Sequence, residues 1–389
     1  MTARIMVVGS GWRFASGISH YTYKLSEALA EQYSVSALLM RGLVPRRLYP
    51  GGRRVGAALT DAAYPANIPV YDGVDWYWGP SLTGALRFLD EQRPDTVVLQ
   101  WWTGAVLHTY LRLARHAVRR GARVIMEWHE GQDVGEAALP AARRYVGALL
   151  PRLLSRVDAH VVHSAFDLDA ISAVHALREV PVAVIPHGPF DHLARSATIA
   201  VPSHDQPFRL LYLGVVRPFK GVEDLVEAFS SLDREQAVRF RLSIVGETWE
   251  GWSAPGAAIA RSPHADLIER VDRYVTDAEL GEYFAQADAV VLPYHRSSAS
   301  GPLQIAMSAG LPVVTTAVGG LVEAARDYPG AVLVPPCDPA VLRHALLELP
   351  QRRGQRYDDP HSWHQTAESF RSLIGSLATG GGRGEASWS

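Results

Sequence analysis

The stretch LGVVRPFKGVEDLVEAF, residues 213–229, joins an apolar run to a segment whose apolar residues have helical spacing. The run Arg209–Leu213 predicts a strand, and Val222–Leu232 predicts a helix. The loop between them contains Gly214 and Gly221. A strand, a glycine-containing loop and a helix in this order form the repeating unit of a parallel α/β sheet.

The same loop carries two cations, Arg217 and Lys220, three residues apart at the start of the predicted helix. They can converge on one diphosphate, Arg as a planar fork and Lys as a compact charge; alternatively they are ordinary surface charges. Of the 38 basic residues only Lys24 and Lys220 are lysines, which favours a specific use of Lys220. Lys24 falls on the exposed side of the predicted first helix and has no assigned role.

Outward from this stretch, strand-like and helix-like segments alternate along most of the chain. In the first half the predicted strands are Arg4–Val8, Val35–Met40, Thr96–Gln100, Arg123–Glu127, His160–His163 and Val182–Ile185, and Tyr21–Glu31 is one of the predicted helices. In the second half Phe240–Val245 and Ala289–Leu292 are predicted strands, Asp277–Gln286 is a helix, and the rhythm runs on to Val334. The pattern predicts two doubly wound α/β domains, with ligands bound beyond the carboxyl ends of the strands, in a cleft between them.

Composition shifts set the predicted domain boundaries. Residues 1–195 form the first domain, a polar, Pro-containing linker covers 196–207, and 208–360 form the second domain. Residues 361–378 read as one long helix, and 379–389 as a Gly-rich disordered tail.

Charge and cysteine usage exclude several classes of protein. The formal net charge of −2 gives no electrostatic case for nucleic-acid binding. Residues 1–195 carry 21 basic and 17 acidic residues, so a mildly basic first half could contact a membrane surface or an anionic substrate, or be a solvated face. The lone Cys337 fits a reducing compartment. The longest uncharged run, 297–322, is interrupted by Gly and Pro, so no transmembrane helix is expected.

Three further segments could carry chemistry. Ser300 and Gly301, before a helix that Pro302 can start, could present amides to an anion or be a plain helix cap. The loop from Gly9 to Gly17 is a weak dinucleotide fingerprint, because Phe14 stands where a Gly is needed.

The third segment places His129 at the end of a buried strand, where it could bond a substrate hydroxyl with help from Glu127, Glu130 or Asp133. His160 and His163 on one strand would point to opposite faces, so a metal site is disfavoured. Trp101 and Trp102 could stack on a sugar or fill the core.

Together these motifs resemble the family-4 glycosyltransferases, retaining nucleotide-sugar-dependent enzymes with the GT-B fold. The matching segments include VIPHG at 184–188, IVGE at 244–247, ADAVVLPY at 287–294 and SGPLQIAMSAGLPVVTTAVGGLVE at 300–323, besides residues 213–229. They run in the family's order over nearly the whole chain. Many members carry two Glu residues, with seven residues between them, before the Ala-Met pair, where this chain has Ser297 and Ile305.

The resemblance implies two Rossmann-like domains and a last helix that crosses back to the first domain. It implies catalytic roles for His129 at the transferred sugar and for Arg217 and Lys220 at the diphosphate. The donor-binding residues would be Gly17, Gly246, Glu247, Val275, Ser298, Ser300, Gly301, Gln304 and Glu323, and the acceptor-binding residues Trp101, Trp102 and Asp133.

The sequence therefore predicts a metal-independent hexosyltransferase that retains anomeric configuration and needs no cofactor beyond its nucleotide-sugar donor. The acceptor would be a sugar-containing molecule, and the location cytoplasmic, with peripheral membrane contact through the first domain left open. A non-catalytic nucleotide-sugar binder and a sugar-nucleotide epimerase of the same fold are the alternatives.

Overall fold

The computed structural model describes residues 3–12, 17–42, 62–76, 79–131, 139–191, 206–249 and 251–379. The chain divides into two compact units, Met1–Gly188 with His361–Ser389, and Pro189–Pro360. The first unit thus ends at residue 188, seven residues before the boundary expected at 195. The expected linker 196–207 and tail 379–389 lie almost wholly outside the described residues.

The first unit is built on a seven-stranded sheet with the order β3-β2-β1-β4-β5-β6-β7, and all its strand pairs are parallel. The strands are β1 (Arg4–Ser10), β2 (Ser34–Gly42), β3 (Val70–Asp75), β4 (Thr96–Trp101), β5 (Arg123–Trp128), β6 (Ala159–Val162) and β7 (Val182–Val184). The helices are α1 (Gly17–Ala30), α2 (Pro80–Gln92), α3 (Leu107–Arg119), α5 (Pro140–Leu154), α6 (Ala165–Val174) and α15 (Trp363–Thr379).

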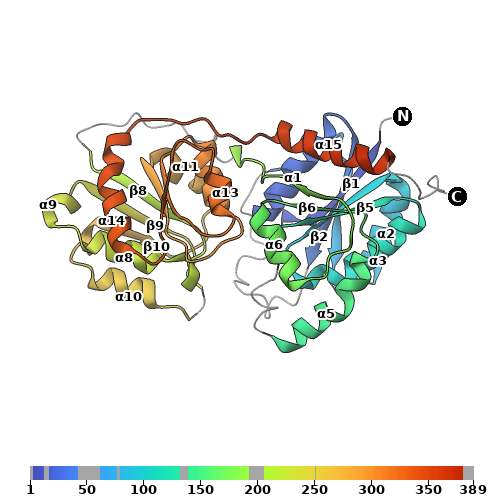
Figure 1. Ribbon diagram of the computed structural model, residues 1–389, viewed down its shortest axis with the longest axis horizontal. Coiled ribbons are helices and arrows are strands. Elements are labelled where there is room, and N and C mark those ends of the chain that lie inside the picture. Colours follow the sequence, from blue (N-terminus) through green and yellow to red (C-terminus); the bar gives the residue numbers. More distant parts are fainter. Residues whose placement is uncertain are drawn as a thin grey trace. The chain divides into compact units, whose positions relative to one another are not determined.

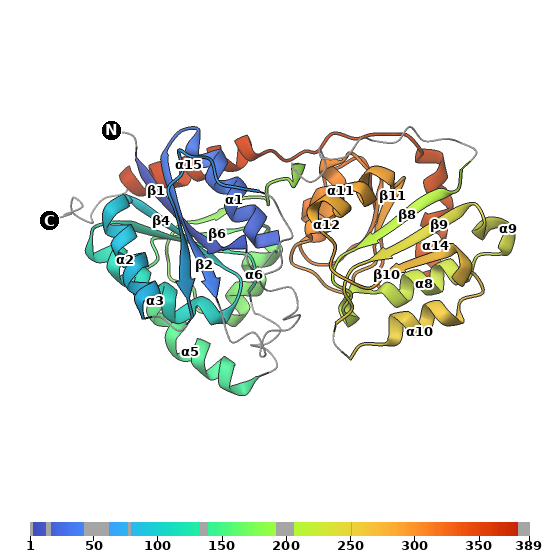
Figure 2. The same ribbon diagram turned by 180° about the vertical axis from the view of Figure 1, so that it is seen from behind.

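Both faces of this sheet are buried, because alternate residues of a strand point to opposite faces. On β1, Met6 and Val8 pack in one core cluster with α2, α3 and α5. Ile5 and Val7 pack in another with α1 and α15. Helices cover the two faces in this way in Figures 1 and 2.

The last helix returns to the first unit, although residues 189–360 separate it in sequence from the rest of that unit. α15 buries Phe370 and Ile374 and packs against α1, which buries Leu25 and Leu29. These are apolar residues at helical spacing on both helices.

The second unit has a six-stranded sheet with the order β10-β9-β8-β11-β12-β13, again entirely parallel. Its strands are β8 (Phe208–Leu213), β9 (Phe240–Val245), β10 (Ile268–Val271), β11 (Ala289–Leu292), β12 (Val313–Thr316) and β13 (Ala331–Val334). Its α-helices are α8 (Val222–Ser230), α9 (Arg234–Ala237), α10 (Ala254–Arg261), α11 (Asp277–Gln286), α12 (Gly301–Ser308), α13 (Leu321–Ala325) and α14 (Pro339–Glu348). From β8 the chain adds β9 and β10 on one side of the sheet and then β11, β12 and β13 on the other side. The topological switch point therefore lies between β8 and β11.

None of the described helices is both long enough and apolar enough to cross a bilayer.

Candidate functional site

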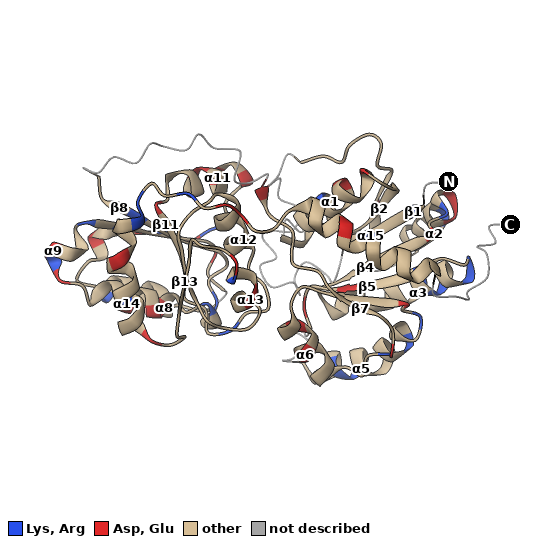
Figure 3. Cartoon of the chain, turned by 45° about the horizontal axis from the view of Figure 1, so that its top comes forward, with Lys and Arg blue, Asp and Glu red and all other residues tan. Residues whose placement is uncertain are grey.

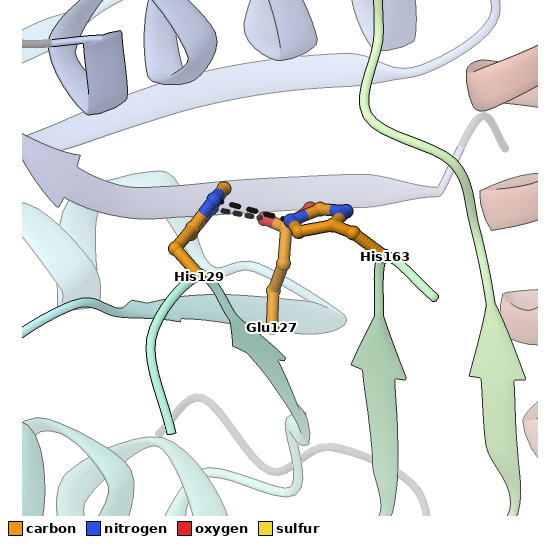
Figure 4. A group of neighbouring side chains, drawn as sticks. All are labelled: Glu127, His129 and His163. Carbon is orange, nitrogen blue, oxygen red and sulfur yellow. Dashed lines mark hydrogen bonds and ion pairs between the residues drawn. The ribbon is translucent and has the colours of Figure 1, made fainter. Parts of the chain in front are cut away.

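In the first unit, polar side chains gather where β4, β5 and β6 end. Gln100 and Glu127 come from β4 and β5, His129 follows β5, and His163 follows β6. Tyr21 of α1 lies against them, with its ring centroid 4.7 Å from that of His129. Because the carboxyl ends of parallel strands share one edge of a sheet, residues far apart in sequence meet here. Figure 4 shows Glu127, His129 and His163.

Glu127 is fully buried and is held by two donors. The Tyr21 hydroxyl donates to Oε1 at 2.6 Å, and Gln100 Nε2 donates to Oε2 at 3.0 Å. Burial acts to raise the pKa of Glu127, but His129, His163 and the Tyr21 hydroxyl together lower it. The site therefore contains an ionised carboxylate that is shielded from solvent.

A chain of ring contacts continues from His129. Its Nδ1 lies 3.1 Å from Nε2 of His163, and Nδ1 of His163 lies 3.0 Å from the carbonyl oxygen of Ile185. Burial and the neighbouring His129 lower the pKa of His163 to about 4, so His163 is neutral at neutral pH. The remaining nitrogen of His129, Nε2, has no hydrogen-bond partner among the described residues and lies 3.7 Å from Oε2 of Glu127.

In the second unit, the loops after β8 and β9 are bonded to each other. Val216 N donates to the carbonyl oxygen of Glu247 at 3.0 Å, and Trp249 N donates to that of Val216 at 2.9 Å. This pairing places the Arg217 guanidinium 4.4 Å from the centre of a Trp249 ring. A cation over an indole face is attracted by the ring quadrupole, so Trp249 helps to hold Arg217 in place.

Lys220 lies over another aromatic ring. Its Nζ is 3.5 Å from the ring centroid of Tyr294, which follows β11. The next residue, Gly221, has a φ of 61°, and a Cβ there would come within 1.9 Å of the Pro293 carbonyl oxygen. Only glycine allows the loop carrying Lys220 to approach the end of β11 this closely.

Ser300 caps α12, which limits what the helix start can offer a ligand. Its Oγ accepts from Leu303 N at 3.3 Å, its carbonyl accepts from Gln304 N at 3.1 Å, and Pro302 has no N–H. Within the described chain, Gly301 is left as the first-turn amide with no bond of its own. The helix-start amides expected from the sequence thus reduce to one.

Most of the other predicted donor residues lie on this edge of the second unit. Gly246 follows β9 and packs against Gly214, which follows β8, while Ser298 lies in the loop before α12. Glu323 is in the first turn of α13, and Gly320 N, just before that helix, donates to the Ser297 carbonyl oxygen at 3.2 Å. Of the remainder, Glu247 lies in the loop after β9, Val275 and Gln304 are buried, and Gly17 begins α1 in the first unit.

The three residues predicted to bind the acceptor differ in how exposed they are and in whether the structure describes them. Trp101 is only 1% exposed and packs against Trp128 in the core. The prediction that an acceptor stacks on Trp101 is therefore wrong. Trp102 is half-buried and retains surface, whereas Asp133 lies outside the described residues.

Sequence reasoning did not assign roles to Tyr21, Gln100, His163, Trp249 or Tyr294. Gln100 and His163 were detectable in principle, because both end predicted strands on the edge where ligands bind. Tyr21 had no such signal, because its partner Glu127 is 106 residues away.

Two groups of described residues could each offer three metal-ligand atoms within 4.8 Å of one another, namely Glu127 with His129 and His163, and Asp224 with His295 and Cys337. In the first group, a hydrogen bond joins His129 Nδ1 and His163 Nε2, and His129 Nε2 lies 3.7 Å from Glu127 Oε2. In the second, His295 Nε2 lies 2.9 Å from Asp224 Oδ2, and Cys337 is exposed. Neither arrangement requires an ion.

Two family models match this chain. A glycosyl transferase 4-like domain matches residues 16–188, and the model described as glycosyl transferases group 1 matches residues 207–352. Each match falls within one of the two compact units, and the first match ends at residue 188, where the first segment of the first unit ends.

Curated relatives resemble this chain over much of its length. A D-inositol 3-phosphate glycosyltransferase of Kineococcus radiotolerans is 29% identical, and the match covers 75% of this chain and 68% of the relative. A glycogen synthase of Mycobacterium tuberculosis is also 29% identical, over 72% of this chain and 64% of the relative. The chain thus spans about two thirds of the length of these relatives.

Solved structures share the fold at low identity. A glycosyltransferase from Rickettsia africae superposes with a TM-score of 0.67 at 13% identity, covering 98% of this chain and all of that one. Anabaena HepE in complex with UDP and glucose gives 0.66 at 14% identity, with coverages of 96% and 100%. Sucrose-phosphate synthase from Thermosynechococcus elongatus gives 0.64 at 17% identity, with coverages of 97% and 100%. The fold of the chain is GT-B.

Proposed function

Because the chain belongs to the glycosyl transferases of group 1 with their 4-like first domain, we propose that it moves a hexosyl unit from a nucleotide-diphosphate sugar to an acceptor hydroxyl, with retention of anomeric configuration. One observation of the structure carries the proposal. Arg217 and Lys220 are each held over an aromatic ring at the carboxyl edge of the second sheet, as an anion-binding pair would be.

In this reaction the bond between the sugar C1 and the diphosphate oxygen breaks while C1 bonds to the acceptor oxygen on the same face. The acceptor proton passes to the leaving phosphate oxygen. Negative charge grows on the diphosphate, and the Arg217 guanidinium, the Lys220 ammonium and the Gly301 N–H would stabilise it. These groups are fixed before the reaction, so little reorganisation is needed.

We propose that the two cations perform this role without a metal ion or a further cofactor, because together they can offset the charge of a leaving diphosphate. His129 of the first unit would contact the transferred sugar. Activity that persists in excess EDTA would support the metal-independent part of the proposal.

We further propose that an anionic or lipid-linked acceptor draws the enzyme to a membrane surface. α3 and α5 pack against each other, and neither contains an acidic residue. Together they expose Arg112, Arg115, Arg119, Arg143 and Arg144. Figure 3 shows blue segments on both helices. Such a surface suits anionic lipid headgroups.

The central test screens UDP-glucose, UDP-N-acetylglucosamine and GDP-mannose by calorimetry, and then measures release of nucleoside diphosphate. We expect one donor to bind and turn over, and Arg217→Ala and Lys220→Ala each to lower kcat/KM on the order of 100-fold. Arg261→Ala, at an exposed site at the end of α10, is the control and should behave as wild type.

The alternatives predict other outcomes. A non-catalytic binder, which the replacement of the paired Glu residues by Ser297 and Ile305 favours, would bind donor without releasing diphosphate. An epimerase would return an altered nucleotide sugar without an acceptor. Wild-type turnover in both site variants would show that the diphosphate site lies elsewhere.

A further inference from the structure

The hydrogen bonds that link Ile185, His163 and His129 have a fixed direction from donor to acceptor, which the backbone carbonyl of Ile185 determines. The Ile185 oxygen can only accept, and it lies 3.0 Å from Nδ1 of His163. Nδ1 of His163 must therefore carry a hydrogen. Since His163 is buried and neutral, its Nε2 has no hydrogen and can only accept.

The tautomer of His163 in turn determines that of His129. Nδ1 of His129 lies 3.1 Å from the bare Nε2 of His163, so His129 must donate there and must carry a hydrogen on Nδ1. A free imidazole can carry its hydrogen on either nitrogen. Here the carbonyl of Ile185, acting through the ring of His163, determines which nitrogen of His129 carries it. Nε2 is then the nitrogen of His129 that remains for a further hydrogen bond.

That nitrogen makes no hydrogen bond with the described residues. Nε2 of His129 is buried, has no hydrogen bond among the described residues and lies 3.7 Å from Oε2 of Glu127, which is beyond hydrogen-bonding distance. A buried polar atom without a hydrogen bond is destabilising, so such an atom calls for a hydrogen-bond partner beyond those in the chain. The side chain of His129 is 4% exposed, and Tyr21 and His163 pack on its ring.

We infer that His163, through its bond to the Ile185 carbonyl, is a positioning residue that fixes the proton of His129 on Nδ1 and so presents Nε2 to a hydroxyl of the transferred sugar. The inference rests on the proposed function, which places His129 at that sugar. In this arrangement Nε2 of His129 faces the hydroxyl and can form a hydrogen bond with it. Glu127, held by Tyr21 and Gln100, stands beside the same nitrogen and favours a donor group between them.

The direct test is the tautomer itself, read on the full chain labelled with [15N]histidine by long-range proton–nitrogen correlation spectra. Wild type should show the proton of both His129 and His163 on Nδ1. In His163→Leu, which removes the acceptor, the His129 signal should lose this single-tautomer pattern. In His163→Gln, the amide can donate to Ile185 and accept from His129, so the Nδ1–H pattern should persist.

Activity supplies the second readout. His163→Leu should lower kcat/KM for the best donor of the panel at least tenfold, and His163→Gln should recover most of that loss. Binding of the free nucleoside diphosphate, assigned to the second unit, should be unchanged in both variants. This separates loss of positioning from general damage, which a thermal melt of each variant also monitors.

A proton on Nε2 of His129 in wild type would overturn the inference, whatever the activity. So would a His163→Leu variant that folds and keeps wild-type kcat/KM. If wild type releases no nucleoside diphosphate from any donor, the proposed function fails, while the spectra still decide the tautomer of His129.

Discussion

Lys220 is held by its surroundings more closely than a surface lysine. Its Nζ lies 3.5 Å from the Tyr294 ring centroid, and the following Gly221 brings the loop against the end of β11. A guanidinium is larger and flatter than an ammonium and would have to rotate or lift away from this ring. In a chain with 36 arginines and two lysines, retention of Lys at this position indicates that the size of the charge matters.

We therefore expect Lys220→Arg to bind donor but to lower kcat/KM about tenfold, equivalent to roughly 1.4 kcal/mol of transition-state stabilisation. Steady-state release of nucleoside diphosphate measures this. Lys24→Arg is the matched control, because Lys24 pairs with Glu27 at 3.2 Å on α1 and has no assigned role in the reaction. Equal kcat/KM for Lys220→Arg and wild type would mean that catalysis requires a positive charge at this position but not the smaller ammonium group.

Residues close in sequence were the predictable part of the candidate site. Arg217 and Lys220 share one loop, so spacing and residue type indicated a common ligand before any fold was known. The bond between Tyr21 and Glu127 joins α1 to β5 across 106 residues, and no local pattern encodes it. Trp101 could not be assigned from sequence for another reason. A tryptophan can stack on a sugar or pack in a core, and only its burial in the structure distinguishes the two.

At the scale of elements, the loops after β8 and β9 fit together through two glycines. Gly214 and Gly246 both have positive φ, 137° and 141°, and a Cβ on Gly246 would lie 2.1 Å from the Gly214 carbonyl oxygen. The close approach lets Val216 bond to Glu247 and places Trp249 under Arg217. The geometry of the cation site thus depends on a backbone contact some distance from the cations.

Gly246→Ala should therefore affect both stability and activity. The strained backbone costs on the order of 1–3 kcal/mol, which lowers the melting temperature of the second unit by several degrees. The same shift should displace Arg217 and weaken donor binding. Gly375→Ala, in an exposed turn of α15 where a Cβ meets nothing within 4 Å, should be neutral or slightly stabilising. Calorimetry of both variants makes the comparison, and an unchanged melting profile for Gly246→Ala would contradict the steric argument.

Strands in the middle of each sheet were predictable, and some at the edges were not. β1, β4 and β5 are buried, apart from the first residue of β1 and of β5, and each contains a run of at least three apolar residues. β3 and β10 lie at sheet edges, where Asp72 of β3 and Glu269 of β10 point away from any core. An edge strand is stabilised by one neighbour and tolerates charges, so its sequence loses the apolar signal on which the prediction depends.

At the scale of the whole molecule, charge is distributed unevenly although the net value is only −2. The arginines on α3 follow the spacing of one helical stripe, at positions 112, 115 and 119, beside the equally acid-free α5. Arg152 and Arg156 near the end of α5 have a local role, because they bond carbonyl oxygens of the helix's last turns. The three α3 arginines are all exposed and follow one stripe, so they are the residues changed in the test of membrane attraction.

We expect the protein to co-sediment with vesicles of phosphatidylglycerol but not of phosphatidylcholine, and to be released as salt rises, because screening weakens the attraction. Each arginine near an anionic bilayer contributes about 1 kcal/mol, so changing Arg112, Arg115 and Arg119 to Gln should weaken binding roughly 100-fold. The matched control changes three exposed arginines of the second unit, Arg239, Arg261 and Arg326, and alters the net charge equally. If both triple variants bind alike, overall charge rather than this surface governs the attraction, and the membrane proposal fails.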